Sequence, residues 1–420
     1  MQIDAARTAN ELISAVSMAM DIEGGVKLYH GWHVAIIATH LAEAVDEADS
    51  LEGFYGGLLH DVGAVGLPQH VVNYLGTEIR HADGPTRPVD PGFISHSLLS
   101  AEIVSSLPGV AGAARAVLDH HEDWNGHGFP RALREHEIGL DAQILHAADT
   151  ADLLLRSEPA PDLDEATDHV AALDRASFRP DVTELLIEQL RAGLYEKLLV
   201  PADLDELFEA TRADVGPIPV EPGTDAIGVT LDILARVVDN KHSYTVGHSR
   251  RVARYALLIG IAMGLEHDAL TLLKWAALIH DVGKLSCPTG MLDKPAQLSP
   301  EEYETMKFHA SYTFDIVSMI TDLRPVAIVA SSHHERWDGQ GYPLGWAGEQ
   351  IPLGSRIIAV ADAFDAITSR RPYRRTSDVD MACDEVRRSA GSQFDPEVAR
   401  VALPVLRNLG AAIGIGGPTA

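Results

Sequence analysis

The chain has 420 residues, and its 33 Lys and Arg against 61 Asp and Glu give a formal net charge of −28. With 46% hydrophobic and 22% charged residues it has the composition of a folded globular protein and not of a disordered one. The acidic balance argues against general binding to nucleic acid polymers or acidic membrane surfaces, and no apolar run reaches the roughly 18–20 residues that span a bilayer.

The first residues lack the basic-then-apolar pattern of a secretion signal, and the chain has only two cysteines, Cys287 and Cys383. We therefore expect a cytoplasmic protein with no membrane partner and no disulfide framework. The composition has one unusual feature, a total of 20 histidines. Histidine is the commonest neutral metal ligand in proteins.

In chain order, histidines and aspartates recur in the same pattern in both halves. The sequence HHEDWNGHGFP at 120–130 aligns without a gap to HHERWDGQGYP at 333–343. His96 and His309 each precede the His pair by 24 residues, and an aspartate follows the second His of each pair by 28 residues. The corresponding sets are His30, His60, Asp61, His96, His120, His121 and Asp149, and His248, His280, Asp281, His309, His333, His334 and Asp362.

This repetition predicts two copies of one fold, residues 1–212 and 227–420, joined by a Pro- and Gly-containing linker over 213–226. Apolar residues recur at helical spacing through both copies, and no convincing alternation typical of strands is present. In the second copy, Val326, Val329 and Ala330 continue in helical register to His333 and His334, which predicts both histidines on the buried face of a helix. We expect an all-α protein built of two tandem helical bundles.

The second copy directs five histidines and two aspartates from apolar helices toward one interior. Buried imidazoles and carboxylates are unfavourable unless they are paired or bind metal. Seven such groups are too many for one tetrahedral zinc, so the set predicts two metals, bridged by Asp281. Nitrogen and oxygen ligands without thiolate favour iron, manganese, zinc or nickel over copper(I).

The motifs HDVGK at 280–284, HHERWDGQGYP at 333–343 and RPYR at 371–374 together resemble the HD-GYP family of the HD phosphohydrolase superfamily. The resemblance covers about residues 228–405, and residues 25–200 resemble the same family in degenerate form. It implies two HD-type helical domains and a metal-dependent phosphodiesterase that acts on cyclic di-GMP. It also implies iron or manganese before zinc or nickel, and GGDEF-type synthase proteins as partners.

The resemblance assigns roles to individual residues of the second copy. Asp281 and Lys284 match catalytic positions, and the substrate-binding positions correspond to Lys284, Tyr342, Arg371 and Arg374. Family members with three metals carry a glutamate four residues before the first histidine. Because that position is Tyr244 here, we expect two metals, with His248 either a weak ligand or a residue that only lines the site.

The first copy keeps all seven metal positions but changes the substrate positions. Lys284 aligns with Ala64, Tyr342 with Phe129, Arg356 with Gln143, and Arg371 with Glu158. Two interpretations remain open for this copy: a regulatory or dimerising domain that keeps its metal, or a hydrolase for a differently held substrate.

The sequence thus predicts hydrolysis of cyclic di-GMP to pGpG, GMP or both in the second copy. One alternative is hydrolysis of another cyclic dinucleotide such as 3′,3′-cGAMP. The other is a non-catalytic cyclic di-GMP sensor or scaffold. A homodimer is compatible with each of these hypotheses.

Overall fold

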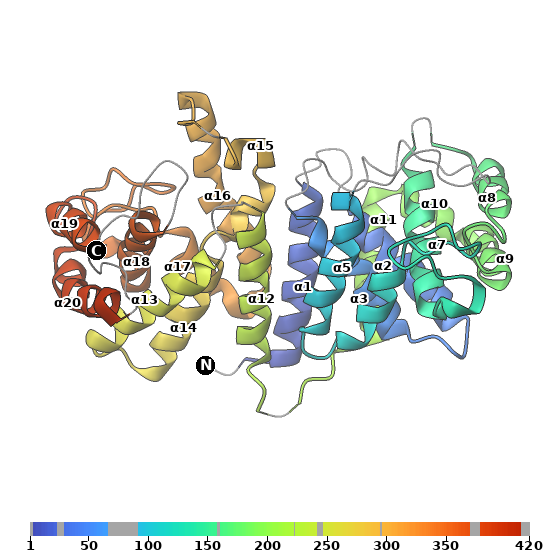
Figure 1. Ribbon diagram of the computed structural model, residues 1–420, viewed down its shortest axis with the longest axis horizontal. Coiled ribbons are helices and arrows are strands. Elements are labelled where there is room, and N and C mark those ends of the chain that lie inside the picture. Colours follow the sequence, from blue (N-terminus) through green and yellow to red (C-terminus); the bar gives the residue numbers. More distant parts are fainter. Residues whose placement is uncertain are drawn as a thin grey trace, which may run out of the picture. The chain divides into compact units, whose positions relative to one another are not determined.

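The structure is a computed structural model that describes residues 3–22, 29–65, 91–157, 160–221, 223–241, 247–294, 296–369 and 379–412. It divides into two compact units, an N-terminal unit (Ala5–Thr230) and a C-terminal unit (Leu231–Ala420, grouped with Met1–Asp4). Both units are helical (Figure 1), and the described segments contain only two isolated β-bridges and no strand. The all-α fold expected from the sequence is confirmed.

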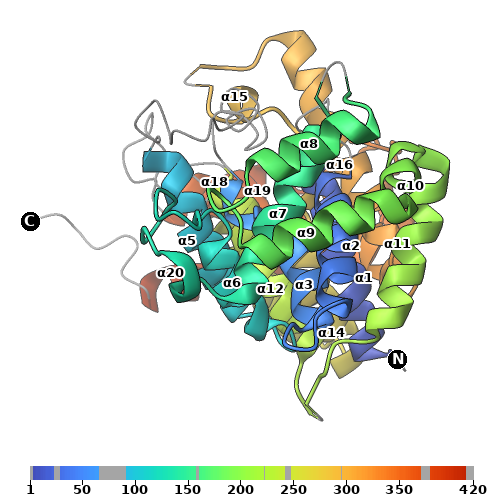
Figure 2. The same ribbon diagram turned by 90° about the vertical axis from the view of Figure 1, so that its right-hand side faces the viewer.

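The N-terminal unit consists of helices, and short 3₁₀ or π-helical turns are labelled η. They are α1 (Ala5–Ile22), α2 (His30–Glu43), α3 (Ser50–Leu59), η1 (Val62–Ala64), α5 (Pro91–Ser105), η2 (Ala111–Ala113), α6 (Ala114–Asp119), η3 (Glu135–Glu137), α7 (Leu140–Leu155), α8 (Leu163–Ala172), α9 (Pro180–Gln189), η4 (Leu190–Leu194), α10 (Tyr195–Leu199) and α11 (Pro201–Val215). Helix α2 is buried almost throughout and packs on α3 and α7, with α9 against both α2 and α7 (Figure 2). A helix that is apolar all round belongs in the centre of a bundle.

The C-terminal unit repeats this arrangement. Helix α12 (Ala226–Asn240) contains the division between the units, and it is followed by α13 (His248–Ala262), α14 (His267–Ile279), η5 (Val282–Ser286), α15 (Thr289–Leu292), α16 (Pro300–Ser318), η6 (Thr321–Leu323), α17 (Arg324–Ser331), η7 (Gly348–Gln350), α18 (Leu353–Thr368), α19 (Val379–Arg388) and α20 (Pro396–Ala412). Helix α13 packs on α14 and α18, and α16 packs on α17 and η5. These contacts correspond to those of α2 with α3 and α7, and of α5 with α6 and η1.

Local signals in the sequence explain where several of these helices begin. Ser299 caps α16, its hydroxyl accepting from Glu302 N–H while the Glu302 carboxylate accepts from Ser299 N–H. Asp49 accepts from the first backbone N–H groups of α3. The helices that carry the first histidine of each set, α2 and α13, both follow a residue with φ of 72°, Tyr29 and Gly247.

One helical prediction is wrong in detail. Helix α17 ends at Ser331, so His333 and His334 lie in the turn just beyond it and not on its buried face. The histidine pair at 120–121 likewise follows the end of α6. The segment 213–226 contains the end of α11 and the residues before α12; its role as a domain linker stays a prediction.

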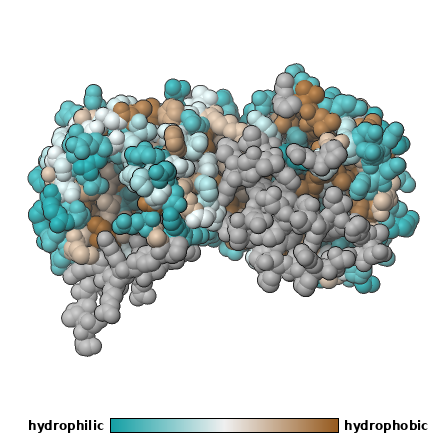
Figure 3. Space-filling view, turned by 90° about the horizontal axis from the view of Figure 1, so that it is seen from above, coloured by the Kyte–Doolittle hydropathy of each residue, from teal (hydrophilic) through white to brown (hydrophobic). Residues whose placement is uncertain are grey.

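No described helix is both long and apolar enough to cross a membrane. On the face drawn in Figure 3, the described residues mix hydrophilic and hydrophobic side chains.

Candidate metal centres

Each unit places its His-Asp pair at the end of a helix, against a second helix that carries another histidine. His280 ends α14, and Asp281 leads into η5. Gly283 then lets α16 approach closely, because a Cβ added there would lie 2.0 Å from the carbonyl oxygen of His309. Gly63 plays the same part, with a Cβ position 2.4 Å from the carbonyl oxygen of His96. The glycine two residues after the aspartate therefore brings the third histidine to the pair.

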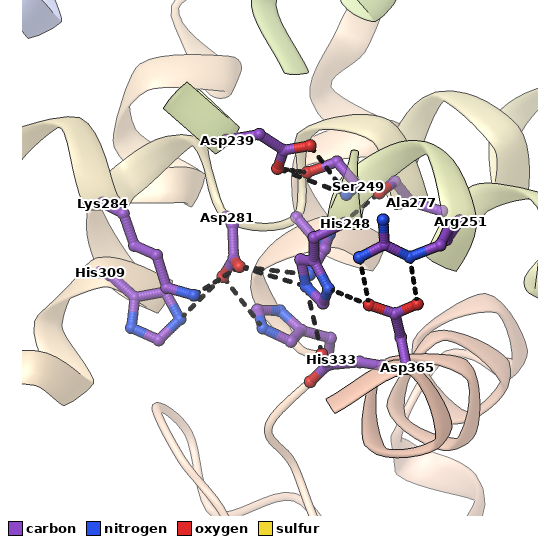
Figure 4. Close-up of polar contacts among 12 residues, drawn as sticks. Asp239, His248, Ser249, Arg251, Ala277, Asp281, Lys284, His309, His333 and Asp365 are labelled. Atoms are coloured by element: carbon purple, nitrogen blue, oxygen red, sulfur yellow. Dashed lines mark hydrogen bonds and ion pairs between the residues drawn. The ribbon is translucent and has the colours of Figure 1, made fainter. Parts of the chain in front are cut away.

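Asp281 lies at the middle of the C-terminal centre. Its Oδ1 is 3.5 Å from Nε2 of His309 and 3.8 Å from Nε2 of His333. Its Oδ2 is 3.4 Å from Nε2 of His280 and 3.8 Å from Nε2 of His248. Figure 4 shows His248, His309 and His333 around this carboxylate. Its two oxygens face different histidines, an arrangement suited to bridging two ions.

The donor atoms fall into overlapping groups whose members all lie within 4.8 Å of one another. The groups are Asp281, His309, His333 and His334; His248, His280 and Asp281; and His280, His333 and Asp362. The structure therefore brings together all seven residues of the set expected from the sequence.

Backbone carbonyls orient three of these imidazoles. Nδ1 of His280, His309 and His333 lies 2.9, 2.6 and 2.6 Å from the carbonyl oxygen three residues earlier. If Nδ1 carries the proton and donates, Nε2 keeps its lone pair toward the centre. Within the described part of the chain, these Nε2 atoms and Oδ1 of Asp281 are buried and have no hydrogen-bond partner. Such acceptors are unfavourable in isolation but fit a metal, and orientation of a ligand through its other nitrogen is typical of metal sites.

Burial also sets the charge of the ligand histidines. It lowers the pKa of His309 to about 4 and that of His334 to about 3, so both are neutral near pH 7, as ligation requires. Burial also lowers the pKa of His248, but hydrogen bonds to Asp362 and Asp365 outweigh it and raise this pKa to about 10. Burial alone would raise the pKa of Asp281, yet Lys284 and the histidines hold it well below its ordinary value.

Asp365, a residue that the sequence analysis missed, supports the first histidine. Its Oδ2 lies 2.8 Å from Nδ1 of His248, and Arg251 Nε donates to its Oδ1 at 2.7 Å (Figure 4). Asp365 lies three residues after Asp362 on α18, so the two carboxylates share a helix face. That spacing was the available signal.

The N-terminal centre repeats the same geometry around Asp61. Its Oδ1 is 3.3 Å from Nε2 of His96 and 3.9 Å from Nε2 of His120, and its Oδ2 is 3.4 Å from Nε2 of His60 and 3.8 Å from Nε2 of His30. The donor groups are Asp61, His96, His120 and His121, and His30, His60 and Asp149. All seven positions of the first set therefore converge as well.

The support of the first histidine differs between the units. Asp152, the counterpart of Asp365, lies 2.6 Å from Nδ1 of His30. His33 occupies the position of Arg251, with Nδ1 2.5 Å from Asp152. The arginine comes instead from Arg156 at the end of α7, whose Nε donates to Asp152 at 2.7 Å. Both units therefore have an aspartate on the first histidine, but the arginine that binds this aspartate comes from different helices in the two units.

Comparison with known protein families shows which family this chain belongs to. The HD domain family matches residues 32–179 and 232–398, three quarters of the chain and most of both units. The chain belongs to the HD domain family. The HD-type family membership expected from the motifs is thus confirmed, in both copies.

Relatives of this HD protein include enzymes with known substrates. A 3′3′-cGAMP-specific phosphodiesterase of Vibrio cholerae is 30% identical over 71% of this chain and 64% of its own length. A cyclic di-GMP phosphodiesterase of Thermotoga maritima is 37% identical over 44% of this chain and 51% of its own length. The chain thus spans between half and two thirds of these two relatives.

A solved structure supports the HD fold across both units. The crystal structure of a cyclic GMP-AMP specific phosphodiesterase from Vibrio cholerae aligns with a TM-score of 0.62 at 23% identity, covering 95% of this chain and 97% of that one. At 23% identity, this structural similarity shows a shared fold.

The residues expected to contact substrate lie beside the C-terminal HD centre as far as the structure describes them. Lys284 Nζ donates to Asp281 Oδ2 at 2.5 Å, and the Tyr342 ring centroid is 4.8 Å from that of His334. Arg371 and Arg374 lie outside the described residues, as does Glu158. Among the N-terminal counterparts, Phe129 is buried, with its ring 4.8 Å from that of His121.

Arg356 aligns with Gln143, and the sequence places it among the substrate positions lost in the first copy. In the structure its side chain contacts other residues of its own unit. Its guanidinium donates to Asp395 at 2.6 Å and to the carbonyl of Ile351 at 2.9 Å. It also lies 5.7 Å from the Trp337 ring centroid. Gln143 similarly joins two backbone groups, those of Glu122 and Arg179. Both side chains support the loop packing of their unit, and a role of Arg356 in substrate binding stays a prediction.

Proposed function

We propose that this protein is a metal-dependent phosphodiesterase that hydrolyses cyclic di-GMP to pGpG, GMP or both at its C-terminal HD centre. The observation that carries the proposal is the position of Lys284, whose ammonium binds the same carboxylate around which the histidines gather. A cation next to a candidate two-metal site suits a phosphate diester, and the Thermotoga maritima relative acts on cyclic di-GMP.

The seven-residue set suits two divalent transition metals per centre, iron or manganese before zinc or nickel. His309, His333 and His334 would hold one ion, and His248, His280 and Asp362 the other, with Asp281 shared. When bound, such ions make a water nucleophilic near neutral pH and neutralise charge on phosphate oxygens. The catalytic residues proposed from this chain are Asp281 and Lys284.

Four side chains would hold the substrate. The Lys284 side chain is 27% exposed, and its ammonium can turn from Asp281 to a phosphate oxygen. Tyr342 can donate its hydroxyl, since burial raises its pKa and keeps it neutral. Arg371 and Arg374 are proposed as the phosphate clamp because guanidinium forks bind two oxygens at once.

A second candidate substrate is 3′,3′-cGAMP. The Vibrio cholerae relative that acts on it aligns with 71% of this chain, against 44% for the Thermotoga maritima enzyme. A third candidate function is a non-catalytic cyclic di-GMP sensor or scaffold, which the presence of Lys284 disfavours.

For the N-terminal unit we propose a metal-bound regulatory or dimerising role in preference to independent hydrolysis. Ala64 and Phe129 offer no charge or hydroxyl to a phosphate. His121 is also buried, at 1% exposed, whereas its counterpart His334 is partly exposed. A homodimer and an association with GGDEF-type synthases are further proposals from the family resemblance. A protein confined to the cytoplasm remains the expectation.

Turnover of purified protein tests the proposed function. Protein loaded with Mn²⁺, or with Fe²⁺ under anaerobic conditions, is incubated with cyclic di-GMP or 3′,3′-cGAMP, and the products are separated by chromatography. We expect linear dinucleotide or mononucleotide from at least one substrate. Tight binding without product would support the sensor, and neither binding nor product would refute both.

A further inference from the structure

We propose that Tyr303, Lys307 and Tyr342 form a nucleobase-binding platform beside the C-terminal metal centre and that it takes a purine of the cyclic dinucleotide. This inference rests on the proposed function and extends it. We call these three residues the aromatic–lysine platform.

The platform extends from the candidate metal ligands to the protein surface, and each of its residues contacts the next. The Tyr342 ring centroid lies 4.8 Å from that of His334 and 6.4 Å from that of His309. Lys307 Nζ lies 5.8 Å from the Tyr342 centroid and 5.1 Å from that of Tyr303. The lysine therefore stands between two aromatic rings, one of them against the centre.

Helix α16 fixes these spacings. Tyr303 and Lys307 are four residues apart, so they are neighbours on the helix surface, and His309 follows two residues later on the same helix. The platform and a candidate metal ligand thus share one rigid element, and a base held by the platform would be positioned relative to the metals.

Tyr303 is accessible to a ligand. The residue is 49% exposed, and it lies next to the Lys307 ammonium, 5.1 Å from its ring centroid. Aromatic faces beside a cation are the usual receptors for nucleobases, and stacking on one ring contributes about 1–3 kcal/mol per base. The Lys307 ammonium binds the Glu304 carboxylate at 2.6 Å, but that carboxylate is 67% exposed, so a ligand oxygen can replace it with little loss.

The N-terminal copy lacks this arrangement. At the aligned positions Lys307 is replaced by Ile94, Tyr342 by Phe129 and Tyr303 by Asp90. Loss of the platform therefore accompanies loss of the phosphate-binding lysine at Ala64, as expected if both serve one ligand.

The experiment compares Tyr303→Ala, Tyr303→Phe and Lys307→Met in the full-length, Mn²⁺-loaded protein. For each, kcat/KM is measured with cyclic di-GMP, with 3′,3′-cGAMP and with bis(p-nitrophenyl) phosphate, a diester that carries no nucleobase. Phe308→Ala is the matched control, because Phe308 is 58% exposed on the same helix and pairs with Tyr312 instead of the platform. Equilibrium dissociation constants for both cyclic dinucleotides are measured in parallel.

Tyr303→Ala and Lys307→Met should lower the ratio of cyclic-dinucleotide to small-diester kcat/KM by about 5- to 50-fold, mainly through KM. Tyr303→Phe, which keeps the ring, should recover most of the loss, and Phe308→Ala should stay at the wild-type ratio. If wild type hydrolyses a cyclic dinucleotide and the ratio and dissociation constant do not change in the variants, the platform is refuted alone. If wild type binds without turnover, a rise in the dissociation constant supports the platform although catalysis fails. If wild type neither binds nor hydrolyses any cyclic dinucleotide, both proposals fail.

Discussion

The Asp365 carboxylate lies 2.8 Å from Nδ1 of His248, and this contact directs Nε2 of the same ring toward Asp281 and Asp362. The N-terminal unit repeats it with Asp152 and His30 at 2.6 Å. A carboxylate on the outer nitrogen fixes the orientation of a ligand histidine and increases its basicity. Asp365 is therefore a positioning residue for the centre, together with Arg251, which binds its other oxygen.

Asp365→Asn should weaken metal binding at the C-terminal centre by about 10- to 100-fold, because an amide orients the imidazole without a negative charge. The measurement is a competition titration of metal against a chelator of known affinity. Asp384→Asn on the surface is the matched control, since its carboxylate contacts only Arg387 among the described contacts. Equal affinity in wild type and Asp365→Asn would contradict the positioning role.

Lys284→Met should lower kcat/KM for a cyclic dinucleotide by about 10²- to 10³-fold, the usual effect of removing one group that stabilises transition-state charge. Metal content, measured by elemental analysis, should remain at the wild-type level because lysine is not in the ligand set. Lys294→Met, which removes an ammonium bound to Glu302, serves as the control. Loss of metal together with activity would show that Lys284 acts only through Asp281.

Gly283→Ala should destabilise the C-terminal unit by about 1–3 kcal/mol, because the new Cβ would meet the His309 carbonyl oxygen at 2.0 Å and the Thr313 nitrogen at 2.6 Å. Backbone cannot rotate away as a side chain can, so η5 and α16 must separate. Urea denaturation measures the change. At Gly290 an added Cβ meets nothing within 4 Å, and Gly290→Ala should leave the midpoint close to wild type.

Metal-free protein should lose stability as the pH falls from about 6.5 to 4. Burial lowers the pKa of His309 to about 4, so over this range the unfolded chain binds a proton that the native state excludes. His248, with its pKa raised to about 10, contributes with the opposite sign, so its stabilisation is present below pH 6.5 and lost between about 6.5 and 10. Thermal denaturation of chelator-treated protein between about pH 4 and 10 measures both effects, and an unchanged midpoint from pH 6.5 to 4 would contradict the prediction for His309.

The sequence sufficed for the fold class and for the convergence of fourteen histidines and aspartates, because the two halves repeat long spacings that only a shared fold explains. It failed where the signal is not periodic. The helical spacing of apolar residues continues to His333, so the sequence predicts a helix there, although α17 ends at Ser331. Periodicity does not mark where a helix ends. The hydrogen bond between Arg356 and Asp395 could not be predicted either, because the two residues are 39 positions apart in the chain and close only in the fold. Asp365 was missed although the signal was present, since Asp152 follows Asp149 by three residues just as Asp365 follows Asp362.

We propose that hydrolysis takes place at the C-terminal centre. Two double variants of the full-length protein, His280→Ala/Asp281→Ala and His60→Ala/Asp61→Ala, test it by turnover of cyclic di-GMP and 3′,3′-cGAMP with Mn²⁺ or Fe²⁺. We expect no product from the first variant and continued hydrolysis by the second. Wild-type activity in the first variant, or its loss only in the second, would contradict it.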